Sequence, residues 1–86
     1  MVRICAHLVK NNRRIKDQLF EFDEEFEISS FEHYVQEICY IFDIPNPVTL
    51  VTHIKNFIVF NHCTYKPDDF VDKVNFDKLV IENARS

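Results

Sequence analysis

The order in which hydrophobic periods follow one another constrains the fold of this 86-residue chain more than any other feature of its sequence. Two runs with apolar residues at alternate positions come first, a run with apolar residues every three or four positions follows, and further alternating runs end the chain. A period of two is typical of a strand with one buried face, and a period near 3.6 is typical of an amphipathic helix. The order therefore predicts a hairpin, one main helix and a second set of strands.

The N-terminal hairpin is predicted from two runs and the polar stretch between them. The first run spans Val2 to Val9, in which every second side chain from Val2 onward is apolar. Residues 11–14 interrupt it with turn-forming asparagines and two arginines. An extended, aromatic-rich run resumes at Leu19 and continues to Phe26. Alternating runs joined by such a polar stretch favour a β-hairpin.

The single predicted helix follows this hairpin. Ser29 and Glu32 have the spacing of a capping box, in which a hydroxyl and a carboxylate each accept a hydrogen bond from a backbone N–H of the first turn. Apolar residues then recur at spacings of three and four: Phe31, Tyr34, Val35, Ile38, Cys39 and Phe42. Pro45 and Pro47 end the helix, because proline lacks a backbone N–H and favours extended geometry in the residue before it. We expect the apolar stripe to form the centre of the core.

The C-terminal half predicts further strands around one irregular segment. Val48 to Ile54 is β-branched and alternating, which favours a third strand, and Phe57 to Phe60 favours a fourth after a tight turn at residues 55–56. Residues 61–77 contain Pro67 and several aspartates, so we expect a long loop or a helical turn there. Three apolar residues should hold this segment against the core: Phe70, Val74 and Phe76. Lys78 to Glu82 is predicted as the last strand.

Together these elements predict an α+β protein with a ubiquitin-like β-grasp fold. We expect a mixed sheet of four to five strands, in the order ββαββ(β), packed on one main helix. Residues 1–86 should form a single domain, because a chain of this length with 47% hydrophobic residues has enough apolar surface for one core. A sheet with a helix on one face leaves its other face and its edges open. The expected function is therefore docking to another protein, and no enzymatic activity is expected.

The absence of glycine excludes several classes of site. Phosphate-binding loops, dinucleotide fingerprints and nucleophile elbows depend on glycine, and this chain has none. His62 and Cys63 are adjacent, with His53 further upstream, but this spacing is not typical of a zinc site. No signal for an activated Cys63 nucleophile accompanies them. We therefore expect no catalytic residues, no metal and no cofactor.

Charge, cysteine content and hydropathy limit the partners and the compartment. The net charge of −4 opposes binding to a phosphate backbone, so nucleic acid is not an expected partner. No apolar stretch approaches the ~20 residues that a membrane-spanning helix needs. The three cysteines are odd in number and widely spaced, which favours free thiols in a reducing compartment. We expect a cytoplasmic protein.

The charges of the first hairpin are arranged in two blocks. Four basic residues come first: Lys10, Arg13, Arg14 and Lys16. Acidic residues follow directly: Glu21, Asp23, Glu24, Glu25 and Glu27. One interpretation is that these are solvated charges that protect an exposed strand from aggregation. The other is that they steer a partner of opposite charge.

Several short motifs resemble the N-terminal ubiquitin-like domain of the engulfment and cell motility (ELMO) family. They are Val35–Cys39 in the helix, Ile44–Pro47 after it, the Asn56–Val59 segment and a last strand around Leu79. The resemblance implies a Ras- or Rho-type GTPase-binding domain of a larger signalling or scaffold protein linked to the cytoskeleton. In such domains the switch region of the GTPase commonly docks on the first hairpin, often by adding a strand to the second strand of the sheet. Carried over by position, the partner-binding candidates are Lys10, Arg13, Arg14, Lys16, Gln18, Leu19 and Phe20.

The alternative hypothesis is self-association of the kind found in other ubiquitin-like modules. A basic face of the first strand, with Lys10 and Arg3, would meet acidic residues of the next copy. The candidate acidic residues are Asp68, Asp69 and Asp72. A head-to-tail contact of this kind generates filaments or open arrays.

Overall fold

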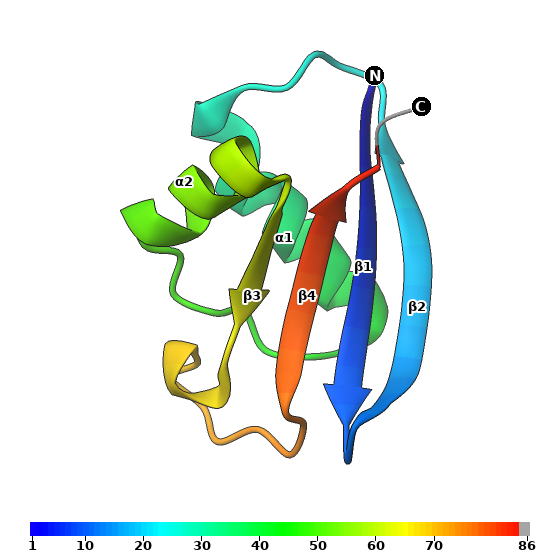
Figure 1. The fold of residues 1–86 in the computed structure, drawn as a ribbon, viewed down its shortest axis with the longest axis vertical. Helices are drawn as coiled ribbons and strands as arrows, with labels where there is room; N and C mark the ends of the chain where they lie inside the picture. The colour runs from blue at the N-terminus through cyan, green and yellow to red at the C-terminus, as the bar shows by residue number, and fades with distance from the viewer. Residues whose placement is uncertain (85–86) are drawn as a thin grey trace.

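The computed structural model describes residues 1–84, which form a four-stranded sheet and two α-helices (Figure 1). The strands are β1 (Val2–Lys10), β2 (Arg13–Phe22), β3 (His62–Tyr65) and β4 (Lys78–Asn83). The helices are α1 (Phe31–Phe42) and α2 (Val51–Phe60), and the short 3-10 turns are η1 (Ile28–Ser30) and η2 (Pro67–Asp69). The predicted α+β class is confirmed. The last two residues of the predicted 1–86 domain lie outside the described residues.

The N-terminal hairpin is confirmed, with a shorter turn than predicted. β1 and β2 pair antiparallel from Val2 opposite Phe22 to Lys10 opposite Arg13. Asn11 and Asn12 alone form the turn, with φ angles of 53° and 62°. Asparagine tolerates this left-handed region better than most residues, and two consecutive positive φ angles suit the twist of a hairpin. Because the turn needs only these two residues, β2 begins at Arg13 and not near Leu19.

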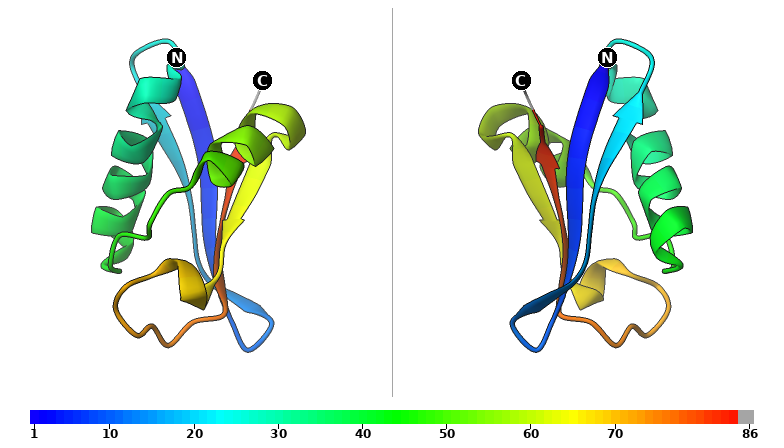
Figure 2. Two further views of the ribbon diagram at one scale, coloured as in Figure 1. Left: turned by 90° about the vertical axis from the view of Figure 1, so that its left-hand side faces the viewer. Right: turned by 90° about the vertical axis from the view of Figure 1, so that its right-hand side faces the viewer.

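The core lies between α1 and one face of the sheet (Figure 2). β1 contributes the alternating side chains that were predicted to be buried: Val2, Ile4, Ala6 and Leu8. Every residue of the predicted apolar stripe of α1 is buried as well. The two surfaces meet because the period of each element places its apolar side chains on a single side.

The start of α1 differs from the prediction, and its end agrees with it. The predicted capping box is wrong, because Ser29 lies inside the turn η1 and its hydroxyl contacts the Glu27 carboxylate at 3.5 Å. Ser30 occupies the N-cap position and makes no side-chain cap bond. At the other end the helix stops before the prolines. Asp43 adopts φ 56°, and the Ile44 N–H donates to the Cys39 carbonyl at 3.0 Å.

The segment predicted as two strands, Val48 to Ile54 and Phe57 to Phe60, is instead helix α2. His53 and Phe57, four positions apart, are buried, and Ile54 is partly buried against the core. Phe57 lies 5.2 Å from Phe31 and 5.8 Å from Phe26, measured between ring centroids. The burial of Phe57 against Phe31 favours the helix over the strand propensity of the β-branched residues.

The sheet is antiparallel throughout and not mixed as predicted. Its strand order is β2-β1-β4-β3, and β4 is antiparallel to both of its neighbours. Helix α2 lies beside one end of β3, so β3 starts at that end of the sheet (Figure 1). Residues 66–77 turn the chain at the opposite end, and β4 therefore runs back against both β1 and β3. The predicted anchors of this segment are confirmed, since Phe70 and Phe76 are buried and Val74 packs against the core.

No helix of the described residues is long and apolar enough to cross a lipid bilayer.

Candidate protein-docking edge

Strand β2 forms one edge of the sheet along its whole length. It pairs with β1 on one side, and its other side has no neighbouring strand (Figure 1). Its ten residues make it long for an edge strand, since strands usually have about five or six residues. The unpaired N–H and C=O groups of such an edge can bind an added strand. The opposite edge, β3, has only four residues.

The predicted basic residues lie at the turn end of this edge, but they are differently engaged. Lys10 and Arg13 face each other across the two-residue turn. Arg14 Nη1 lies 3.1 Å from the Asp17 carboxylate. The Lys16 ammonium donates a hydrogen bond to the carbonyl of Phe42, at the C-terminal end of α1. Lys10 and Arg13 have no ion pair among the described residues, so they offer the most available positive charge.

The predicted residues in the middle of β2 differ in whether their side chains are exposed. Gln18 is exposed, and the side chain of Leu19 is 40% exposed. Phe20 is buried in the core, where its ring lies edge to face against Phe42 at 5.6 Å between centroids. Phe20 can therefore contribute only its backbone to docking. The resemblance implied that Phe20 belongs to the docking edge, but the face on which its side chain lies depends on the register of β2 with β1.

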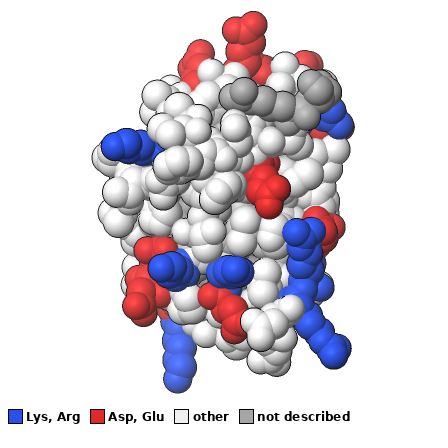
Figure 3. Space-filling model, in the orientation of Figure 1, with Lys and Arg blue, Asp and Glu red and all other residues white. Residues whose placement is uncertain are grey.

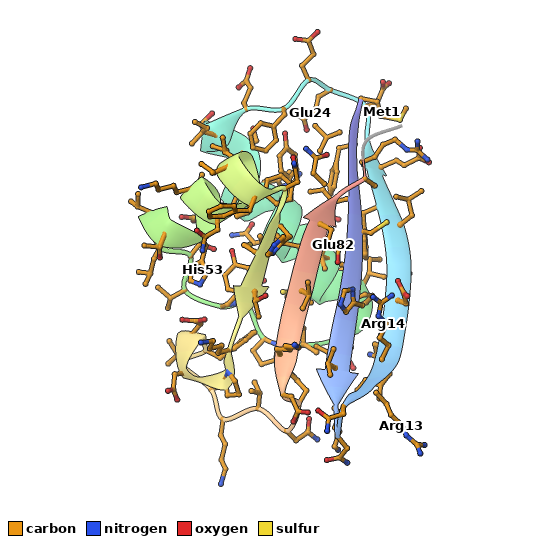
Figure 4. All side chains as sticks on the ribbon, in the orientation of Figure 1. Met1, Arg13, Arg14, Glu24, His53 and Glu82 are labelled. Carbon is orange, nitrogen blue, oxygen red and sulfur yellow. The ribbon has the colours of Figure 1, made fainter. Side chains whose placement is uncertain are left out.

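The face of the sheet opposite α1 is open, and Figure 3 looks onto it. Few charged side chains occupy the middle of this face, and basic side chains gather over the turn end of β1 and β2. Arg14 lies near the lower part of β2 and Glu82 lies on β4 (Figure 4). Arg3 Nε lies 3.3 Å from Glu21 Oε2, although the geometry is not that of a hydrogen bond. This ion pair offsets the negative charge of Glu21 on the docking edge.

His7 lies near the centre of the open face, opposite Asp17 of β2 and Val80 of β4. Its side chain is 7% exposed because its neighbours cover it. Burial lowers the pKa of His7, and the nearby positive charge of Arg14 lowers it further, while Glu82 and Asp17 act in the opposite direction. The result favours the neutral imidazole, so His7 adds no charge to this face near neutral pH.

His53 stabilises the start of α2. Its Nδ1 accepts a hydrogen bond from the Leu50 N–H at 2.9 Å, and its Nε2 lies 3.3 Å from the Asp69 carboxylate. Its ring stacks on Tyr65 at 4.3 Å, and the Tyr65 hydroxyl lies 2.9 Å from the Thr49 hydroxyl. Both imidazole nitrogens are therefore engaged within the fold.

The other features considered for chemistry are Cys63, as a nucleophile, and groups of side chains that could hold a metal ion. Cys63 is buried, and burial raises the pKa of its thiol to about 12, which opposes formation of a nucleophilic thiolate. Across residues 1–84, no group of three or more His, Cys, Asp and Glu side chains is arranged to hold a metal ion.

The residues proposed for head-to-tail assembly are partly occupied within the chain. Arg3 pairs with Glu21, and the Asp69 carboxylate accepts a hydrogen bond from the Lys66 backbone N–H at 2.8 Å as well as facing His53. Asp68 and Asp72 remain exposed. The acidic side of that contact is therefore reduced to isolated surface charges.

The sequence analysis missed a second exposed surface, on helix α2. Large apolar side chains point to solvent there: Leu50, Val51, Ile58, Val59 and Phe60, with exposed fractions between 43% and 81%. They were missed because the segment was predicted as strands. The spacing of four positions between His53 and Phe57 was a signal of a helix. An apolar patch of this kind is typical of an interaction surface.

No protein-family model, curated protein sequence or solved structure matches this chain.

Proposed function

We propose that this domain is a protein-interaction module that binds a GTP-loaded GTPase of the Ras or Rho type through strand β2. The observation that carries the proposal is that β2 is a long, unpaired edge whose turn end carries basic side chains. A hairpin followed by a helix across the sheet is compatible with a β-grasp, which supports a ubiquitin-like module. The motifs that resemble the ELMO family supply the class of partner.

Docking would combine strand addition with electrostatic attraction. A strand of the partner would pair with the N–H and C=O groups near Gln18 and Leu19 that point away from β1, and these backbone bonds would supply most of the affinity. Lys10 and Arg13 would attract acidic residues of a switch region and raise the association rate. Phe20 would hold β2 against the core. An interface of one strand and a few exposed charges lies near the low end of specific interfaces, at about 1,200 Å², so we expect micromolar affinity.

Calorimetric titration against a panel of GTP-loaded and GDP-loaded GTPases tests the proposal. We expect binding only in the GTP-loaded state, and we expect the double variant Arg13→Glu/Arg14→Glu to bind more weakly. The difference should shrink at high salt, because exposed charges are screened.

The matched control is Lys55→Glu/Lys66→Glu, which makes the same change in net charge on exposed residues far from β2. This control should bind as the wild type does. Binding that is independent of nucleotide throughout the panel, or equal weakening by both double variants, would contradict the proposal.

A further inference from the structure

The charges along β2 are ordered so that the strand is complementary to itself in the antiparallel direction. Three of its first four residues are basic, and Asp17, which follows them, pairs with Arg14. Residues 18–20 are uncharged, and acidic residues come next: Glu21 within the strand, and Asp23 and Glu24 directly after its last residue, Phe22. Arg13 and Arg14 lie towards the turn end of β2, and Glu24 lies in the loop after β2 at the opposite end of the sheet (Figure 4). A second copy that runs in the opposite direction would place each basic end beside an acidic end.

We propose that two copies of this chain associate through β2 about a two-fold axis and join their four-stranded sheets into one continuous antiparallel sheet. The axis would pass through the uncharged middle of β2, perpendicular to the sheet. Around Gln18 as the centre, Arg13 and Asp23 stand at equal distances along the chain, so that the basic end of each copy would lie near the acidic end of the other. Such a contact is isologous and closes at the dimer.

The structure favours this edge over the other edge of the sheet. β2 contains no proline, and its register irregularity is confined to the turn end, between Leu8 and Val9 of the partner strand. Proline and a central bulge, which are among the features that oppose strand addition, are therefore absent from its middle. β3 is short, and α2 and η2 adjoin its two ends, which leaves little free backbone.

The ion pairs within the described residues leave several charged residues of β2 and of the segment after it without a partner. Arg14 and Glu21 have partners within the chain, Asp17 and Arg3, at 3.1 Å and 3.3 Å. Arg13, Asp23 and Glu24 are exposed and make no ion pair among the described residues. The unpaired charges therefore lie at the first residue of β2 and just beyond its last residue, where the second copy would bring opposite signs together. This arrangement also differs from the head-to-tail contact, which uses Asp68 and Asp72.

The self-association does not depend on the GTPase proposal, but it uses the same backbone groups. A GTPase strand and a second copy could not bind β2 at the same time. The buried area is again that of one strand pair, so we expect a weak dimer with a dissociation constant on the order of 10–100 µM. At lower concentrations the edge would be free for another partner.

Sedimentation velocity of the protein alone, over about 5–500 µM, tests the inference without any GTPase. We expect a monomer–dimer equilibrium that weakens at high salt. Two charge-reversed variants, Arg13→Glu/Arg14→Glu and Asp23→Lys/Glu24→Lys, should each dimerise at least about tenfold more weakly, because each lost contact occurs twice in the symmetric dimer. An equimolar mixture of the two variants should restore dimer formation, since opposite charges then face each other again. Lys55→Glu/Lys66→Glu should dimerise as the wild type does.

Hydrogen exchange locates the interface without any substitution. At dimer-forming concentrations we expect new protection of those β2 amides near Gln18, Leu19 and Phe20 whose N–H groups point away from β1, and none in β3. A wild-type protein that stays monomeric over the whole range would overturn the inference. So would assemblies larger than the dimer, a mixture of the two variants that stays monomeric, or concentration-dependent protection confined to β3 or α2.

Discussion

Replacement of Ile38 by alanine tests the central packing of the fold. Ile38 lies in the middle of α1 and is completely buried between the helix and the sheet. The change removes three carbon atoms, which at about 0.8 kcal/mol per buried methylene corresponds to about 2.4 kcal/mol of lost transfer free energy. The cavity left behind raises the expected loss to about 3–4 kcal/mol. A domain of 86 residues has a free energy of unfolding of about 4–13 kcal/mol, so the loss is a large share of the total.

Ile41→Ala is a matched control, because it makes the same chemical change on the same helix. Ile41 is 50% exposed, and the substitution should lower the free energy of unfolding by less than about 1 kcal/mol. Urea denaturation followed by circular dichroism, with linear extrapolation, measures both values. Equal losses for the two variants, or a loss below about 1 kcal/mol for Ile38→Ala, would refute the packing argument.

Three further predictions concern single features of the fold. The pKa of His7 is lowered in the folded state from its ordinary value of 6.5, mainly by burial. The unfolded chain therefore binds more protons than the folded chain does in the pH range just below 6.5. The contribution of neutral His7 to the free energy of unfolding should be complete above pH 6.5 and should decline as the pH falls below it. His7→Gln should flatten urea-denaturation stabilities measured between about pH 5 and 8, and an unchanged slope would contradict this account. Burial raises the thiol pKa values of Cys39 and Cys63 to about 12, so both should react with a disulfide reagent only after denaturation, and fast labelling of either in the native state would show that its site is open. Asp43→Gly should raise the free energy of unfolding by about 0.5–1 kcal/mol, because glycine adopts the left-handed conformation after α1 without a steric penalty; a lower value would mean that the Asp43 side chain stabilises this end of the helix.

Two elements could be predicted from the sequence because their local period coincides with their burial. The alternation from Val2 to Leu8 matches a strand with one covered face, and the stripe from Phe31 to Phe42 matches a helix against that face. Paired asparagines placed the turn between the first strands. In these segments the information that decides the structure lies within a few residues along the chain.

Helix α2 could not be predicted in the same way. Its β-branched residues favour a strand by propensity, whereas the structure stabilises a helix through contacts with distant residues. Phe57 packs on Phe26 and Phe31, and His53 accepts a hydrogen bond from Leu50 while facing Asp69, sixteen positions away. Tertiary contacts outweighed local propensity here, and the exposed apolar surface of α2 was missed as a consequence.

The sequence by itself determined the first hairpin, the core helix and the block of basic residues that begins β2. Only the tertiary structure decided that β2 lies at an edge, because that depends on β4 pairing with the other side of β1. It also decided that Arg14 pairs with Asp17 and that Lys16 binds the end of α1. Strand order and side-chain pairing depend on contacts between residues far apart in the chain, and hydrophobic periodicity carries no information about which strands become neighbours.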